Sequence, residues 1–408
     1  MLQEQVEREA SSARAAAAVL GDEAVAAALA AAAAILRERR AAVVAANKAD
    51  LEAAAGRLDA GMLDRLRLDV DAAAAQVEAT AALAPLDREI GRRTLANGLV
   101  VEERRIPIGT VGANFEARPN VALDVAGQLL KSLNAAVLRT GGAALRTVAV
   151  LVDEVLRPAL EHAGLPPAAV GLVRSADRAG ARVLVSMPAL VPLVILRGSG
   201  PATAELAGLA ATNGVRTLAH AEGGGVLYVH AAAAREKALA LAEASLDRLG
   251  VCNRLNLLLV DRAARELLEP LLEVVRGRGV EVRGEGGLPL DRPLGHEWAS
   301  DPERVATVTV ALVDGLEDAL RIANDETSGL AAGIVTEDGG AAQRFLDGYR
   351  GTAGFWHAPT RFADGYELTG APETGINVDG VPGPRGPVTY RDLWLRQYRV
   401  VGDGTQRR

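Results

Sequence analysis

The sequence has almost no cysteine, because Cys252 is the only one among 408 residues. A single cysteine cannot form a disulfide within the chain, and no Cys/His cluster has the spacing of a zinc site. We therefore expect neither a disulfide-stabilised fold nor a bound metal. Any chemistry that needs a thiol has to use Cys252.

The sequence also lacks an excess of positive charge and a long apolar run. Its net charge of -7 gives no broad cationic field, which argues against nucleic acid as a partner. The most apolar stretch, "AVAAALAAAAAIL", is too short to span a bilayer and is followed by "RERR". The first residues lack the basic-then-apolar order of a signal peptide. We expect a soluble, cytoplasmic protein with no membrane partner.

The order of patterns along the chain predicts an α/β protein with two parallel-sheet domains. Residues 1–84 are rich in helix formers, and from residue 106 strand-like and helical stretches alternate, which is typical of βαβ units. A second alternating unit runs from about residue 231 to 362. We predict a cofactor-binding domain over 1–228, a catalytic cysteine domain over 229–362, and a return to the first domain with an oligomerisation tail over 363–408.

Two strand-like runs flank "ANG" within residues 91–109, which predicts a hairpin that projects as an arm. The tail "GPRGPVTYRDLWLRQYRVVGDG" ends in another strand-like run. We expect this run to pair with the hairpin, in the same subunit or across a dimer. We therefore expect the protein partners to be further copies of the chain, in a homodimer or higher homo-oligomer.

Two predicted strands end in Arg and Gly, in "VLRTGG" and "VILRGSG". Ligands of parallel sheets lie at such strand ends, and glycine lets the backbone approach phosphate oxygens. A dinucleotide site here would use Arg139, Gly141, Gly142, Arg197, Gly198, Ser199 and Gly200. Ordinary turns with surface arginines explain the same pattern, and no GxGxxG motif follows the first strand.

The stretch "NFEARPNV" places polar side chains between a strand and a helix. We assign Glu116 and Arg118 to substrate binding, since a guanidinium can hold a carboxylate or phosphate with two hydrogen bonds. Asn120 can donate its amide N–H to a developing oxyanion. Helix capping explains Asn120 equally well, but does not explain Glu116 and Arg118.

Cys252 lies in a loop, "GVCN", between the two alternating units. Lone cysteines are mostly buried and inert. At this seam, however, a thiolate could attack a carbonyl held at the strand ends of the first unit. On these residues alone, both interpretations stay open: a buried, inert thiol and a nucleophile.

Three further residues in loops are candidates for binding. Glu222, in "AEGGG", is assigned to the cofactor side and is also a possible general base; a solvated turn glutamate is the alternative. Arg361 and Arg385, in "TRFADG" and "GPRGP", are predicted to bind an anionic substrate. Surface arginines are the more frequent explanation of such residues.

Several of these stretches resemble the glutamate-5-semialdehyde dehydrogenase (gamma-glutamyl phosphate reductase) family, within the aldehyde dehydrogenase superfamily. The most diagnostic segment is "RIPIGTVGANFEARPNVALDVAGQLLKSLNAAVLRTGG", and "EARPNV" is its most specific part. "GRLDAGMLDRLRLD", "VCNRLNLLLV", "TRFADG", "RGP" and "VVGDG" resemble the family too. The resemblance covers nearly the whole chain.

The resemblance implies an aldehyde-dehydrogenase-like fold with an oligomerisation arm and NADP(H) as the cofactor. It implies that an acyl phosphate acylates Cys252 and that the thioester is then reduced, giving the semialdehyde of proline biosynthesis. Asn120 and the backbone N–H of Cys252 would form the oxyanion hole. Arg139 would lie at the adenosine ribose, and Glu297, in "HEW", resembles the glutamate that holds the nicotinamide ribose.

Some positions depart from the family pattern. Residues 330–332 read Leu-Ala-Ala in place of His-Ser/Thr-Asp, Asn256 replaces a glutamate, and "FWHAPTRF" replaces "VNASTRF". These departures leave two alternatives open: a paralogue acting on another acyl phosphate or aldehyde, and a noncatalytic scaffold. With Glu222 as a base that activates water, the product would be a free acid.

Overall fold

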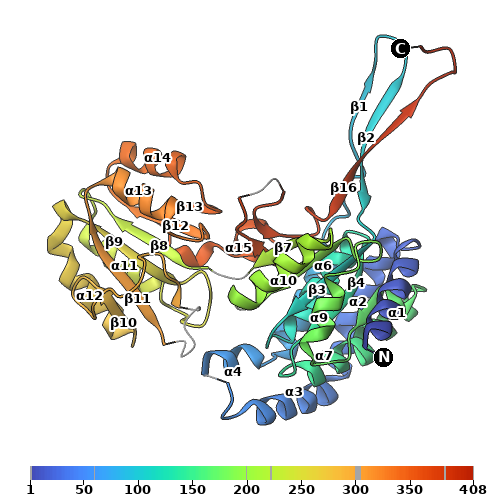
Figure 1. The fold of residues 1–408 in the computed structure, drawn as a ribbon, viewed down its shortest axis with the longest axis horizontal. Coiled ribbons are helices and arrows are strands. Elements are labelled where there is room, and N and C mark those ends of the chain that lie inside the picture. Colours follow the sequence, from blue (N-terminus) through green and yellow to red (C-terminus); the bar gives the residue numbers. More distant parts are fainter. Residues whose placement is uncertain are drawn as a thin grey trace.

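The computed structural model describes residues 2–58, 60–198, 200–220, 223–298, 305–380 and 383–407. Two α/β domains lie next to each other, and a β arm projects from the one that contains the N-terminus (Figure 1). This architecture confirms the predicted fold class.

The described part of the first domain has one parallel sheet with the strand order β5-β4-β3-β6-β7. Its strands are β3 (Thr110–Phe115), β4 (Ala135–Thr140), β5 (Val170–Leu172), β6 (Leu193–Arg197) and β7 (Arg216–His220). Side chains alternate between the two faces of a strand. Ala136 and Leu138 of β4 accordingly join one buried cluster, whereas Ala135 and Val137 join another.

Helices cover both faces of this sheet. One face packs against α1 (Leu2–Ala17), α9 (Arg178–Leu184) and α10 (Gly200–Thr212). The other packs against α2 (Asp22–Glu38), α5 (Val70–Ala82), α6 (Asn120–Lys131), α7 (Leu145–Val150), the π-helical turn η1 (Leu151–Leu156) and α8 (Arg157–His162). Between α2 and α5 lie α3 (Arg40–Ala54) and α4 (Ala60–Leu66). The Ala-rich helices pack because their buried residues recur at helical spacing, as Val25, Leu29 and Leu36 do in α2.

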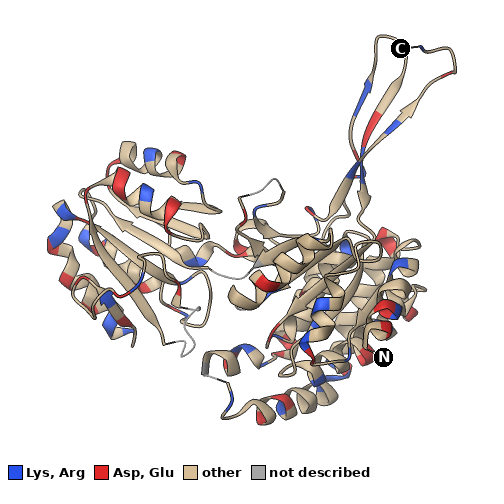
Figure 2. Cartoon of the chain, in the orientation of Figure 1, with Lys and Arg blue, Asp and Glu red and all other residues tan. Residues whose placement is uncertain are grey.

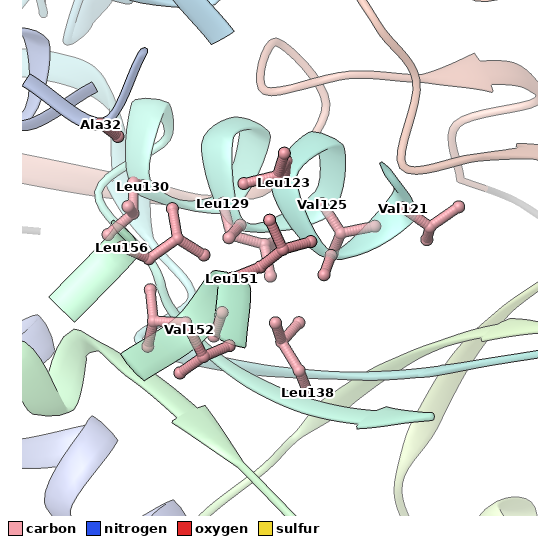
Figure 3. Packing of buried hydrophobic residues seen from close by; sticks show 14 of the residues in the cluster. Ala32, Val121, Leu123, Val125, Leu129, Leu130, Leu138, Leu151, Val152 and Leu156 are labelled. Carbon is pink, nitrogen blue, oxygen red and sulfur yellow. The ribbon is translucent and has the colours of Figure 1, made fainter. Parts of the chain in front are cut away.

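The position of α6 matters most for function. Val121, Val125 and Leu129 follow one another at intervals of four residues and belong to one buried cluster, in which Val125 and Leu129 lie on the side of α6 toward Leu138 and Leu151 (Figure 3). Four-residue spacing places side chains on one face of a helix. The same spacing relates Asn120 to Asp124, which therefore share a different face of α6.

The second domain has a sheet of described strands in the order β10-β11-β9-β8-β12-β13, and all of its pairs are parallel. The strands are β8 (Gly225–Val229), β9 (Leu255–Asp261), β10 (Glu281–Gly284), β11 (Thr307–Val313), β12 (Ala331–Val335) and β13 (Ala353–Trp356). One face packs against α11 (Arg235–Ala244), η3 (Arg262–Leu267) and α12 (Leu268–Gly277), and the other against α13 (Leu316–Asp325) and α14 (Gly339–Gly348). Cys252 lies just before β9.

The predicted boundary between the domains is a few residues too late. β8 begins at Gly225, inside the range 1–228 assigned to the first domain, yet it pairs with β9 and β12 of the second sheet. Its sequence, "GVLYV", is a buried apolar run that suits either sheet, so the sequence alone does not show which partners it takes.

The predicted arm and its pairing with the tail are confirmed within one chain. β1 (Glu89–Thr94) and β2 (Val100–Pro107) form an antiparallel hairpin, and β16 (Trp394–Val401) pairs with the other edge of β2. Gly98, in "ANG", turns the chain with a φ of 88°. Near the domain seam, the chain also forms η5 (Thr360–Phe362), α15 (Gly365–Thr369) and a small antiparallel pair, β14 (Gly375–Asn377) with β15 (Gly386–Val388).

Acidic and basic residues alternate over the outer helices of both domains, without a face of one sign (Figure 2). This distribution agrees with the absence of a broad cationic field in the sequence. Within the described ranges, no helix combines the length and apolar character needed to cross a membrane.

Candidate active site

A cavity of about 310 Å³ lies at the seam between the two domains. It brings together five residues that the sequence singled out, namely Arg118, Asn120, Arg197, Cys252 and Arg361. They come from the start of α6, the end of β6, the loop before β9, and η5. Distant stretches of sequence thus meet around the one thiol.

The loop that carries Cys252 is fastened from both domains. On one side, Arg65 of α4 donates from Nε to the carbonyl oxygen of Gly250 over 2.7 Å. On the other side, the amide nitrogen of Asn253 donates to the carbonyl oxygens of Arg361 and Ala363, over 3.0 and 3.1 Å. These contacts hold the partly buried thiol at the cavity wall.

Three glycines pack against the same loop. A Cβ atom at Gly223 would lie 2.9 Å from the Cβ of Cys252, and one at Gly224 would lie 2.7 Å from the Cβ of Asn256. A Cβ at Gly225 would come closer still to Thr360. Close packing behind the thiol therefore requires glycine at all three positions. The interpretation of this stretch as a turn did not predict that packing.

Asn120 does not cap α6. The capping position is Pro119, and no side chain caps this helix end. Instead, the Asn120 amide nitrogen donates to Oδ2 of Asp124 over 3.1 Å, and both residues line the cavity. This contact excludes the capping explanation and leaves the second N–H of the amide for another acceptor.

Asp124 is a carboxylate that the sequence analysis did not identify. Burial, followed by the nearby carboxylate of Glu373, raises its pKa to about 7, against the opposing effects of Arg197 and Asn120. Its position at the fourth residue after Asn120 was the available signal, since such pairs meet on one helix face.

The cavity arginines differ in how they are held. Arg361 pairs with Asp247 over 2.6 Å, and Arg197 lies 3.7 Å from Glu373 and donates to the carbonyl oxygen of Thr374 over 3.3 Å. Within the described ranges, the guanidinium of Arg118 makes no hydrogen bond or ion pair. Burial, followed by the guanidinium groups of Arg65 and Arg197, lowers its pKa to about 9, so it remains charged at neutral pH.

Glu116 does not line the cavity and lies at the strand ends of the first sheet. Cβ atoms built at Gly141 and Gly198 would lie 4.0 and 3.4 Å from its side chain, so it sits between the ends of β4 and β6. Gly142 is exposed beside Ala176, and Gly200 begins α10. Gly141 and Gly198, which were assigned to a dinucleotide, therefore lie beside Glu116, which was assigned to substrate.

Arg139 is neither a surface residue nor free to hold a phosphate. It is only 4% exposed, and it donates to Oδ1 of Asn114 over 3.1 Å. It also donates to the carbonyl oxygens of Ala176 and Asp177 over 2.9 and 3.0 Å. Arg139 thus shapes the loop after β5, through partners that no sequence motif indicates.

Glu297 lies behind the cysteine loop. It is 5% exposed, and its carboxylate accepts the backbone N–H of Gly223. Asn256, one of the departures from the family pattern, anchors this segment: its amide donates to the carbonyl oxygen of His296 over 3.0 Å, and its oxygen accepts the N–H of Trp298 over 3.2 Å.

The remaining predicted residues lie elsewhere. Arg385 is exposed and donates to the carbonyl oxygen of Arg350, so it does not line the cavity. Ser199 and Glu222 lie outside the described residues. Among the residues that the structure describes, no group of His, Cys, Asp and Glu side chains could hold a metal ion.

Comparison with known proteins identifies the family. No protein-family model matches the chain. Over 379 residues, the chain is 38% identical to gamma-glutamyl phosphate reductase of Clavibacter michiganensis. The aligned region covers 89% of this chain and 85% of that protein. The crystal structure of gamma-glutamyl phosphate reductase from Thermotoga maritima superposes with a TM-score of 0.90 at 27% identity, covering 99% of this chain and 100% of that one.

A more distant structure shows the fold alone. An acetylating aldehyde dehydrogenase from Geobacillus thermoglucosidasius superposes with a TM-score of 0.74 at 16% identity, covering 100% of this chain and 98% of that one. The two parallel-sheet domains therefore have an aldehyde-dehydrogenase-like fold. With this fold and these relatives, the chain belongs to the gamma-glutamyl phosphate reductase family of oxidoreductases.

Proposed function

We propose that this protein reduces L-glutamyl 5-phosphate to L-glutamate 5-semialdehyde and releases phosphate, as a step of proline biosynthesis, with NADPH as reductant. The observation that carries the proposal is the meeting of Cys252, Asn120 and Arg118 in one cavity. The names of the relatives supply the substrate, and the cavity has the groups that an acyl phosphate needs.

Cys252 is the proposed nucleophile. Its sulfur attacks the acyl carbon, a C–S bond forms, and the C–O bond to the phosphate breaks, which leaves a thioester and inorganic phosphate. The charge on the carbonyl oxygen is stabilised by the free N–H of the Asn120 amide and by the backbone N–H of Cys252. Asp124 holds the other N–H of that amide and thereby fixes its direction.

Arg118 is the proposed receptor of the phosphate group. It faces the cavity without a hydrogen-bonding partner in the described part of the chain, and its charge interacts with the sulfur of Cys252. A guanidinium binds phosphate oxygens through two parallel hydrogen bonds. Arg197 and Arg361 add positive charge to the same cavity, although protein acceptors already occupy part of their donors.

The strand ends of the first domain are the proposed site of the nicotinamide cofactor. Gly141, Gly142 and Gly198 contribute no side chains there, and α10 begins two residues after Gly198. When bound, the reduced cofactor supplies the hydride that converts the thioester to the aldehyde. The chain's own part is to hold the acyl group on Cys252, with Glu297 supporting Gly223 behind it. We propose NADP(H) rather than NAD(H) on the family resemblance.

The departures from the family pattern do not reach the described wall of the cavity. Leu330 and Ala331 pack under Cys252, and Asn256 anchors residues 296–298. His357 lies 3.6 Å from Glu337. These placements favour the glutamyl substrate over that of a diverged paralogue, because the altered positions support the site from behind.

An assay in the oxidative direction tests the function. Glutamate 5-semialdehyde, supplied as its cyclic pyrroline form, is incubated with NADP and inorganic phosphate, and NADPH is followed by absorbance. We expect NADPH formation to require phosphate and to be faster than NADH formation from NAD. Equal rates without phosphate would mean that water cleaves the thioester, as expected if Glu222 acted as a base. Turnover of other aldehydes only would support the paralogue, and binding of NADPH without any turnover would support the noncatalytic scaffold.

We also propose a homo-oligomer that assembles through the arm, in the cytoplasm, where a free thiol stays reduced. The arm exposes apolar side chains, including Leu395, Tyr398 and Val400, at 49%, 51% and 54%. Exposed apolar clusters of this kind mark protein interfaces. We expect sedimentation to show a dimer or larger species, and a Tyr398→Glu/Val400→Glu double variant to sediment as a monomer. A matched Val19→Glu variant, exposed on the first domain, should keep the assembly; a monomeric parent protein would contradict the proposal.

A further inference from the structure

The carboxylates that line the Cys252 cavity differ in how they are neutralised. Glu373 lies 3.7 Å from Arg197 and accepts the N–H of Gly365 over 3.1 Å. Asp364 accepts the N–H of Tyr366 and so caps α15. Asp124 is bound by the neutral amide of Asn120, and among the described residues no cation lies within ion-pair distance of it.

Such a carboxylate lacks a positive partner. Removing a charged carboxylate from water is costly unless a cation or several donors replace the water. Burial raises the pKa of Asp124 to about 7, with Glu373 as the second cause, which shows that the cavity as it stands disfavours the negative charge. A ligand that brings a positive group to this wall would relieve that cost.

We propose that Asp124, with Glu373 beside it, receives the α-ammonium group of the γ-glutamyl substrate, and so makes the cavity select amino-acid acyl groups. This inference rests on the proposed function, because it concerns the same site and the same substrate. It adds a residue that distinguishes the glutamyl group from a glutaryl group, which has the same carbon chain and carboxylate but no amine.

The positions of the groups suit the length of the substrate. Three carbon–carbon bonds join the α-carbon to the acyl carbon of a γ-glutamyl group, a span of about 4 Å. Asn120 contacts Asp124 directly, so one amide links the proposed oxyanion position to the proposed ammonium position. The guanidinium groups of Arg118, Arg197 and Arg361, which line the same cavity, are left for the phosphate and the α-carboxylate.

A pH dependence follows from this arrangement. Asp124 faces Asn120 on its own helix, Glu373 and Tyr366 from the segment around α15, and Arg197 from β6. Only its ionised form attracts an ammonium group, and a bound ammonium group would lower the raised pKa of Asp124. Substrate affinity should therefore be fully present above pH 7 and weaken as the pH falls below 7, where the free enzyme becomes protonated.

The test compares two aldehydes in the oxidative assay with NADP and phosphate: glutamate 5-semialdehyde and glutarate semialdehyde, which lacks the amine. We expect Asp124→Asn to raise KM for the amino substrate by about ten-fold to a hundred-fold, the range for a lost charge-assisted hydrogen bond. KM for glutarate semialdehyde should change little. Asp314→Asn, which alters an exposed carboxylate paired with Arg262, is the matched control and should leave both values unchanged.

The outcomes separate this inference from the function itself. An unchanged preference in Asp124→Asn, or equal losses for both substrates, would overturn the inference and leave Asp124 as a support for Asn120. No turnover of either substrate by the parent protein would instead reject the proposed function. If Asp124→Asn fails to fold, the pH dependence of KM in the parent protein tests the inference instead. We expect KM to rise below pH 7 for the amino substrate and not for glutarate semialdehyde. The same pH dependence of KM for both substrates would overturn the inference.

Discussion

A Cys252→Ala variant is expected to lose at least about 10³-fold in kcat, because removal of a covalent nucleophile leaves only binding and oxyanion stabilisation. The chain has no second cysteine that could substitute for it. The structure places this thiol on the wall of a cavity next to Arg118 and Asn120, and two anchored segments hold its loop. The rate of NADPH formation measures the loss.

The single thiol makes the control for this prediction unusually direct. Iodoacetamide should add one group to the parent protein and none to Cys252→Ala, and substrate should slow the labelling. Thr212→Ala, at an exposed position of α10, is the matched control and should keep full activity. Activity that persisted in a folded Cys252→Ala protein would rule out the thioester route.

Strand–helix alternation made the sheets predictable, because buried parallel strands leave continuous apolar runs between amphipathic helices. It did not fix the domain boundary, since the residues of β8 suit either sheet. It also did not foresee β10 or the short pair of β14 and β15, whose strands are too short to show a period.

Some residues of the candidate site could be selected from the sequence and others could not. Cys252, Arg118 and Asn120 were selected because of their side-chain chemistry and the motifs around them, and the structure places them around one cavity. Asp124 was not, because an aspartate in an amphipathic helix usually faces solvent. Its role depends on Glu373, which is far away in sequence and comes close only in the folded chain.

Arg139 is a contrasting case. Its position at a strand end predicts a contact with the cofactor, and in the structure its guanidinium is buried among protein oxygens. Gly141 and Gly198 lie at the same strand ends, beside Glu116. The direction of a long side chain depends on acceptors supplied by other segments, and sequence spacing does not reveal these.

An Asn120→Ala variant is expected to lower kcat by about 10²–10³-fold, the range for removal of one oxyanion-hole donor. The amide has two N–H groups, and Asp124 accepts one of them. The other is proposed to meet the oxygen on which charge develops as Cys252 attacks. Because this interaction strengthens in the transition state, the loss should fall mainly on kcat, with a smaller change in KM.

Two measurements separate this role from a structural one. Alkylation of Cys252 by iodoacetamide forms no tetrahedral oxyanion, so its rate in Asn120→Ala should stay near that of the parent protein while reduction falls. Loss of the Asn120 amide also removes a contact that lowers the pKa of Asp124, so that pKa should rise above about 7. The decline of substrate affinity should then begin at a higher pH than in the parent protein. Equal losses of alkylation and reduction would instead mean that Asn120 only maintains the shape of the cavity.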